Sequence, residues 1–198
     1  MSCEKLLQSN KGFTLAEICV VFVLISVLAS ITTFSLMAWS HESQFDKAEQ
    51  NAELIYMAVK NKIAMYKANG TIDEVIADIS KAYTEGQTSI YICCKKEDYK
   101  TYKKLKESRN QDEYQAWAAI NPWAEALFDF VGKYIYDKTV LNAYVLAELD
   151  KETGNVLKVY YSDRTDFYNL SNSSNPILNE YKDYDNRYDK VVGFYSPE

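Results

Sequence analysis

The chain has 198 residues and a formal net charge of −6, enough for one domain of ordinary size. An acidic chain is a poor candidate for wrapping nucleic acid, because the phosphate backbone is bound through clustered Lys and Arg. Tyr is frequent, with 17 residues, and nearly half of the chain is apolar, which excludes a disordered protein. The four cysteines lack CxxC spacing and there is a single His, so neither a metal site nor a dense disulfide framework is expected.

The first element in the chain is a long apolar segment. No charged residue occurs from Ile18 to Ala38, and a helix over this range is about 31 Å long, which matches the hydrocarbon core of a bilayer. The segment is too long for a secretory signal peptide, and a buried core helix is the alternative. Lys5 and Lys11 precede it, while Glu42 and Asp46 follow it. The positive-inside rule then predicts a single pass through the cytoplasmic membrane, with the N-terminus inside and the C-terminus outside.

The helical pattern continues beyond the apolar segment. No Pro or Gly interrupts residues 13–68, and Asn69-Gly70 supplies a left-handed helix end. Apolar residues recur at spacings of three or four and form one stripe: Phe45, Ala48, Ala52, Ile55, Val59, Ile63 and Tyr66. We therefore predict one helix of about 84 Å, whose first half, 13–38, spans the membrane. Its amphipathic second half, 39–69, needs a partner along one face.

One charge, Glu17, lies near the start of the apolar segment. A carboxylate in hydrocarbon costs a few kcal/mol at the membrane centre and less near the interface. Glu17 is therefore either an interfacial residue that reaches the headgroups or a residue whose cationic partner arrives later.

The residues Lys11-Gly12-Phe13-Thr14-Leu15-Ala16-Glu17 resemble the prepilin cleavage motif of type IV pilins and type II secretion pseudopilins. The resemblance covers about residues 5–70 and implies that residues 1–12 are a leader removed by a prepilin peptidase. It further implies cleavage between Gly12 and Phe13, N-methylation of Phe13, and assembly through Glu17 and Phe13 of neighbouring subunits. Many pilins carry a Pro in the membrane segment near the position of Phe34, so the resemblance leaves open whether this helix kinks.

Physical reasoning agrees with these implied roles. Gly12 has no side chain, so an extended backbone can enter a narrow active site. After cleavage, the new ammonium of Phe13 can meet the Glu17 carboxylate of a neighbour in low dielectric, where an unpaired charge is costly. The pairing would fix axial register more than it would add affinity. Implied partners are the peptidase, other pilin subunits, the membrane, and a filament assembly platform with its ATPase.

The sequence of residues 70–198 predicts a globular head. We expect a helix opened by a capping box at Thr71–Glu74 and running to about Ala82, then a strand, three helices, a hairpin, a polar loop and a last strand. The expected ranges are Ser89–Cys94 for the strand, Lys95–Ser108, Gln111–Ile120 and Trp123–Tyr134 for the helices, Val140–Leu149 with Val156–Tyr161 for the hairpin, Asp163–Asp189 for the loop, and Lys190–Tyr195 for the last strand. The fold class is thus α+β and pilin-like: a long helix on a small antiparallel sheet, with a helical insertion at about 95–134 between helix and sheet.

The other candidate sites in the sequence are weaker. Adjacent strand residues face opposite sides, so Cys93 and Cys94 are expected to be free thiols, at least one of them buried, rather than a vicinal disulfide. Cys3 and Cys19 lie in the leader and the membrane. His41 is expected at the membrane interface. Asp183, Asp185 and Asp189 form an acidic loop in which Arg187 disrupts the spacing of a calcium-binding loop.

We find no catalytic motif, and we expect a structural filament subunit without enzymatic activity. A surface pilus, a secretion pseudopilus and a competence pilus remain open, and nucleic acid is a partner only in the last. The bulk of 95–134 favours a minor subunit over the major repeating one. The alternatives are a membrane-anchored ectodomain that binds a ligand without polymerising, and an extracytoplasmic enzyme.

Overall fold

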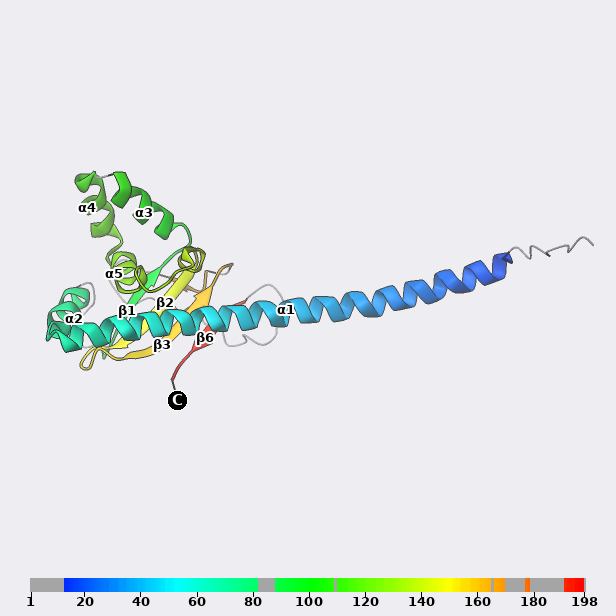
Figure 1. The fold of residues 1–198 in the computed structure, drawn as a ribbon, viewed down its shortest axis with the longest axis horizontal. Coiled ribbons are helices and arrows are strands. Elements are labelled where there is room, and N and C mark those ends of the chain that lie inside the picture. The colour runs from blue at the N-terminus through cyan, green and yellow to red at the C-terminus, as the bar shows by residue number, and fades with distance from the viewer. Residues whose placement is uncertain are drawn as a thin grey trace, which may run out of the picture. The chain divides into compact units, whose positions relative to one another are not determined.

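The computed structural model describes residues 13–81, 88–108, 110–164, 166–169, 177–178 and 191–197. The chain divides into two compact units, Met1–Glu42 and Ser43–Glu198. The layout is α+β: one long N-terminal helix and a small antiparallel sheet of four strands (Figure 1).

The long helix, α1, runs from Leu15 to Ala68, close to the predicted bounds, with no break at Phe34. Gly70 ends it in the left-handed conformation with φ +69°, as Asn69-Gly70 predicts. The amides of Asn69, Gly70 and Thr71 close the last turn by donating to carbonyls of its final residues. The membrane-type segment and the amphipathic segment are therefore parts of one helix.

The sheet has the strand order β1-β2-β3-β6, and all neighbours are antiparallel. Its strands are β1 (Ser89–Cys94), β2 (Tyr144–Asp150), β3 (Val156–Ser162) and β6 (Gly193–Tyr195). The predicted hairpin is confirmed as β2 and β3. In its turn, the Asp150 carboxylate accepts from the Thr153 amide at 2.6 Å, and Gly154 takes φ +66°.

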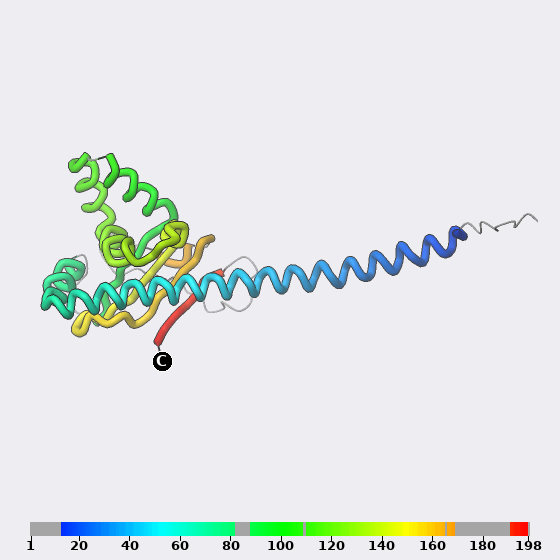
Figure 2. Tube along the Cα trace, viewed as in Figure 1, coloured from blue at the N-terminus to red at the C-terminus, as the bar shows by residue number. Residues whose placement is uncertain are grey.

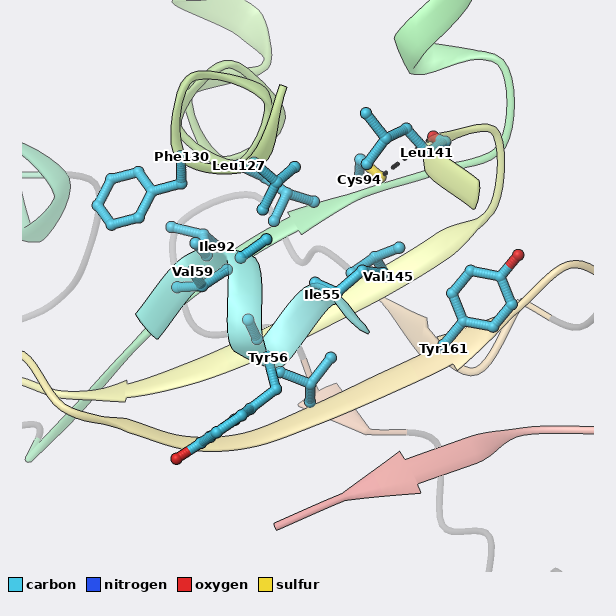
Figure 3. Close-up of a cluster of buried hydrophobic side chains, with 14 of the residues drawn as sticks. Ile55, Tyr56, Val59, Ile92, Cys94, Leu127, Phe130, Leu141, Val145 and Tyr161 are labelled. Carbon is cyan, nitrogen blue, oxygen red and sulfur yellow. Dashed lines mark hydrogen bonds between the residues drawn. The ribbon is translucent and has the colours of Figure 1, made fainter. Parts of the chain in front are cut away.

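The amphipathic half of α1 packs on one face of this sheet. Ala52, Ile55 and Val59 are fully buried, and they share a core with sheet residues such as Val145 and Val159. All residues of the predicted stripe are buried there or packed against this core, which confirms the stripe. Figure 3 shows Ile55 and Val59 of α1 against the sheet, with Ile92 and Val145 beside them.

The helices beyond α1 are α2 (Ile72–Ser80), α3 (Asp98–Ser108), α4 (Gln111–Ile120) and α5 (Pro122–Val131). Pro122 occupies the first turn of α5, as predicted. Helix α5 covers the same sheet face as α1, with Leu127 and Phe130 buried in the common core (Figure 3). Phe128 and Val131 are buried in the same core. Helices α3 and α4 stand further from the sheet (Figure 2).

Three sequence-based expectations are wrong in detail. The helical insertion lies between β1 and β2, not between helix and sheet, because Ser89–Cys94 pairs with β2 and is itself part of the sheet. The first hairpin strand does not begin at Val140, because Lys138–Leu141 forms a 3-10 turn that the Asp137 side chain caps. Val140 and Leu141 are apolar and buried in this turn, so their sequence pattern resembles that of a buried strand.

Contrary to the third of these expectations, Thr71 makes no capping hydrogen bond to α2. Its hydroxyl lies 3.5 Å from the Tyr66 carbonyl, at the end of α1. The helix itself is confirmed, although no capping box opens it. Thr71 follows the stop of α1 directly, and its hydroxyl serves that end instead.

The opposite sheet face carries a smaller core. Cys93, Leu146, Phe167, Tyr168 and Val192 are buried in it. Tyr168–Asn169 (β4) pairs with Ile177–Leu178 (β5), so the predicted loop 163–189 contains a short two-stranded sheet. The predicted last strand is confirmed as the shorter β6.

Candidate processing and assembly site

Of the residues that the motif singles out, Phe13, Thr14 and Glu17 lie within the described part of the chain, whereas Gly12 lies outside it. Phe13 precedes α1 and is 82% exposed. Helix α1 then begins at Leu15, so Thr14 is its N-cap and Glu17 is in its first turn. The expected cleavage position therefore directly precedes a helix start.

Thr14 and Glu17 form a reciprocal capping box. The Glu17 Oε2 atom accepts from the Thr14 amide and from the Thr14 hydroxyl, each at 2.8 Å. In return, the Thr14 Oγ1 atom accepts from the Glu17 amide at 3.3 Å. Two amides that no helical carbonyl can satisfy are paired in this way. Glu17 thus has a local structural role that the charge argument missed, although the Thr-x-x-Glu pattern was readable in the sequence.

The capping box occupies only one carboxylate oxygen of Glu17. Its Oε1 atom has no hydrogen-bond partner among the residues that the structure describes. A carboxylate oxygen accepts charge-assisted hydrogen bonds from ammonium groups. The arrangement can therefore cap its own helix and accept one further donor at the same time.

The helix that follows can cross a membrane. It contains a window of mean hydropathy 2.5, no part of which is buried. Its hydroxyls bond back to carbonyls one turn earlier. The donors are Ser26, Ser30, Thr32, Thr33 and Ser35. Hydrocarbon supplies no partner for a polar group, so these internal bonds make the segment compatible with lipid.

The remaining candidates do not add to this site. Cys93 and Cys94 are free and fully buried on opposite faces of β1, as expected. Burial raises the pKa of both thiols, which keeps them neutral and unreactive. His41 is half-buried. Within the described ranges, no group of three or more His, Cys, Asp and Glu residues could hold a metal ion, and the Asp183–Asp189 cluster lies outside those ranges.

A polar cleft in the head was not anticipated. It measures about 270 Å³ and lies beside α1, where its polar lining includes Lys47, Asn51, Asp137 and Arg164. The Arg164 Nη1 atom donates to the Gln44 Oε1 atom at 2.9 Å. These residues come from segments far apart in sequence, so no local pattern identifies them.

Comparison with known proteins returned no matching family model, no matching curated protein and no matching solved structure.

Proposed function

We propose that this chain is a structural subunit of a type IV pilin-like filament, either a pilus or a secretion pseudopilus. A prepilin peptidase cuts between Gly12 and Phe13, and Phe13 becomes the methylated N-terminus. The mature chain stays in the cytoplasmic membrane, with its head outside, until an assembly platform incorporates it. The chain performs no catalysis.

One observation carries the proposal: Gly12-Phe13 precede in sequence, and Glu17 lies in the first turn of, a 54-residue helix whose first half is apolar and exposed and whose second half packs in the core. A membrane anchor needs about 20 apolar residues. The anchor alone requires neither Gly12 nor Glu17. The Glu17 Oε1 atom, which no described residue bonds, supports pairing with the ammonium that cleavage would create.

The capping box supplies a rival explanation for Glu17, since a helix cap needs no filament. Three variants separate the roles. Glu17→Gln keeps a side chain that can cap but removes the charge. Thr14→Val keeps the charge and removes the hydroxyl of the cap, at a cost of about 1 kcal/mol of helix stability. Glu17→Leu removes cap and charge together and relieves the cost of a charge in lipid.

All three variants are expected to insert and to be cleaved. We expect Glu17→Gln and Glu17→Leu to assemble poorly, so that little of either is found in sheared filaments, and Thr14→Val to assemble. Normal assembly of Glu17→Gln would show that Glu17 only caps the helix. Mass spectrometry of the mature N-terminus tests processing independently: a start at methylated Phe13 is expected, and an intact Met1 or a cut beyond Ala38 contradicts the proposal.

The polar cleft favours one alternative, a membrane-anchored ectodomain that binds a small polar ligand and does not polymerise. Its lining presents cations and carboxylates together, from Lys47, Arg164, Asp137 and Asp163, which suits a zwitterion. A chain that keeps its leader and remains monomeric in the membrane would favour this alternative over the filament.

A further inference from the structure

Helix α1 carries a column of alternating sign that the core does not use. Asp46, Glu53, Lys60 and Lys67 follow one another at intervals of seven residues, and all four are exposed. Seven residues are nearly two helical turns, so the four side chains lie along one gently inclined line on the helix surface. The first two are acidic and the last two are basic. We call this set the charge column.

No member of the charge column forms an ion pair within the part of the chain that the structure describes. Lys60 lies 5.7 Å from the centre of the Tyr56 ring, and Lys67 donates to the Asn155 side chain at 2.6 Å. Met57, an exposed apolar residue, lies four positions after Glu53 and three before Lys60. The column therefore offers opposite charges on either side of an apolar contact point.

Copies of this chain anchored in one membrane have parallel helices, a step that rests on the proposed function. Parallel columns in register bring like charges together at all four positions. A shift of one heptad gives two pairs of like charge and one pair of opposite charge. A shift of two heptads brings only opposite charges together: Asp46 meets Lys60, and Glu53 meets Lys67, of the next copy.

We propose that the charge column binds the same column of a second copy of this chain, parallel and displaced by two heptads, or about 21 Å along α1. Exposed ion pairs add little affinity, whereas like charges in contact exclude competing arrangements. The column thus selects an axial register, as charges flanking a helix–helix seam select partners in coiled coils. It acts far along the helix from Glu17, and therefore as a second, independent determinant of register.

Cysteine cross-linking of the full-length chain in intact filament-producing cells tests the register. In a Cys19→Ser background, where Cys93 and Cys94 are buried, we introduce Asp46→Cys with Lys60→Cys and add a short bismaleimide. The remaining Glu53 and Lys67 keep the register, and a ladder of cross-linked oligomers is expected. Asp46→Cys alone can give only dimers from in-register pairs, and none are expected. Glu53→Cys with Lys60→Cys, which reports antiparallel or one-heptad pairs, is expected to give no ladder. A dimer from the first control or a ladder from the second, without a ladder from Asp46→Cys with Lys60→Cys, overturns the proposal.

Charge reversal supplies the second measurement, read as the amount of chain in sheared filaments. Asp46→Lys with Glu53→Lys makes the column wholly basic and is expected to lose assembly, while adding Lys60→Glu and Lys67→Glu is expected to restore it. Glu49→Lys, off the column, is the matched control and is expected to assemble. If wild type and the Asp46→Lys, Glu53→Lys variant both assemble, the inference about register fails and the proposed function stands. If processed wild type never enters filaments, the proposed function fails and the inference fails with it.

Discussion

Substituting Gly193 by Ala tests how closely β6 lies on α1. A Cβ atom at Gly193 would lie 2.1 Å from the carbonyl carbon of Ala48, 2.2 Å from its oxygen and 2.4 Å from the Glu49 amide nitrogen. All three are backbone atoms of a helix, so no side chain can move aside. The backbone of Gly193 does not lie in the positive-φ region, and the conflict is therefore one of space alone.

The sign of the effect follows from this geometry. At a position whose backbone suits any residue, Gly→Ala stabilises by about 0.4–1 kcal/mol through the unfolded chain. Forcing a methyl group into a packed site costs about 1–3 kcal/mol, and occasionally more. Because β6 is a three-residue strand that, among the described strands, pairs with β3 alone, it is the element expected to move. We expect Gly193→Ala to lower the free energy of unfolding by about 1–3 kcal/mol and to expose the β6 amides.

The assay is urea unfolding of residues 40–198 followed by circular dichroism, with hydrogen exchange at β6. Adding Ala48→Gly is expected not to rescue the variant, since the contacted atoms are backbone. Gly70→Ala is the control: it has open space around it but φ +69°, so it costs about 1–2 kcal/mol without exposing β6. A Gly193→Ala protein that is as stable as wild type, or more stable, refutes the close approach.

Three further predictions concern the head, its thiols and its abundance. Residues 40–198 alone should be soluble and folded. In this fragment, Ile55→Ala should lower the free energy of unfolding by about 2–5 kcal/mol, measured by urea titration, because Ile55 is fully buried. An unchanged free energy of unfolding contradicts the role of the stripe. Cys93 and Cys94 should resist a thiol reagent at neutral pH in the native head and react after unfolding, since burial raises the pKa of both; rapid native labelling contradicts that burial. Quantitative proteomics of sheared filaments should find this chain to be a minor subunit, and its being the most abundant subunit contradicts the prediction.

The bulk of residues 95–134 favours a minor subunit, but not all of it is added to the core domain. Phe128 and Val131 of α5 are buried in the main core, so this helix completes the domain. What remains as added bulk is the rest of α3 and α4, since Tyr102 of α3 is also buried in that core and Trp117 of α4 packs against it. These are joined to α5 by Tyr hydroxyls: Tyr102 donates to Asp129 at 3.0 Å, and Tyr114 donates to Glu125 at 2.6 Å.

Local patterns predicted the parts of the fold that local forces determine. The stripe from Phe45 to Tyr66 follows the helical period, Gly70 is needed for a left-handed helix end, and the Asp150–Asn155 turn joins two strands directly. Pairing of β1 with β2 was missed because some fifty residues separate them and no nearby residue encodes it. The need for Gly at position 193 is likewise visible only once β6 meets α1.

The spacing of Gly12, Phe13 and Glu17 ahead of an apolar helix singles them out as a candidate site, and their roles in cleavage and assembly stay predictions. The bonding of Glu17 was not predicted. The second role of Glu17 was missed because a charge near hydrocarbon suggests a distant partner, whereas Thr14 is three residues away. The polar cleft depends on tertiary contacts between α1 and the residues after β3, which no spacing predicts.

The continuity of α1 has a mechanical consequence. The segment that can cross a membrane and the segment that carries Ile55 and Val59 are one helix with no Pro, Gly or loop between them. In the proposed filament, a pull on the membrane end of α1 would act on the segment that packs on the sheet. To detach that segment, the load would have to strip the whole buried stripe from the sheet, so the hydrophobic core of the head would bear the tension.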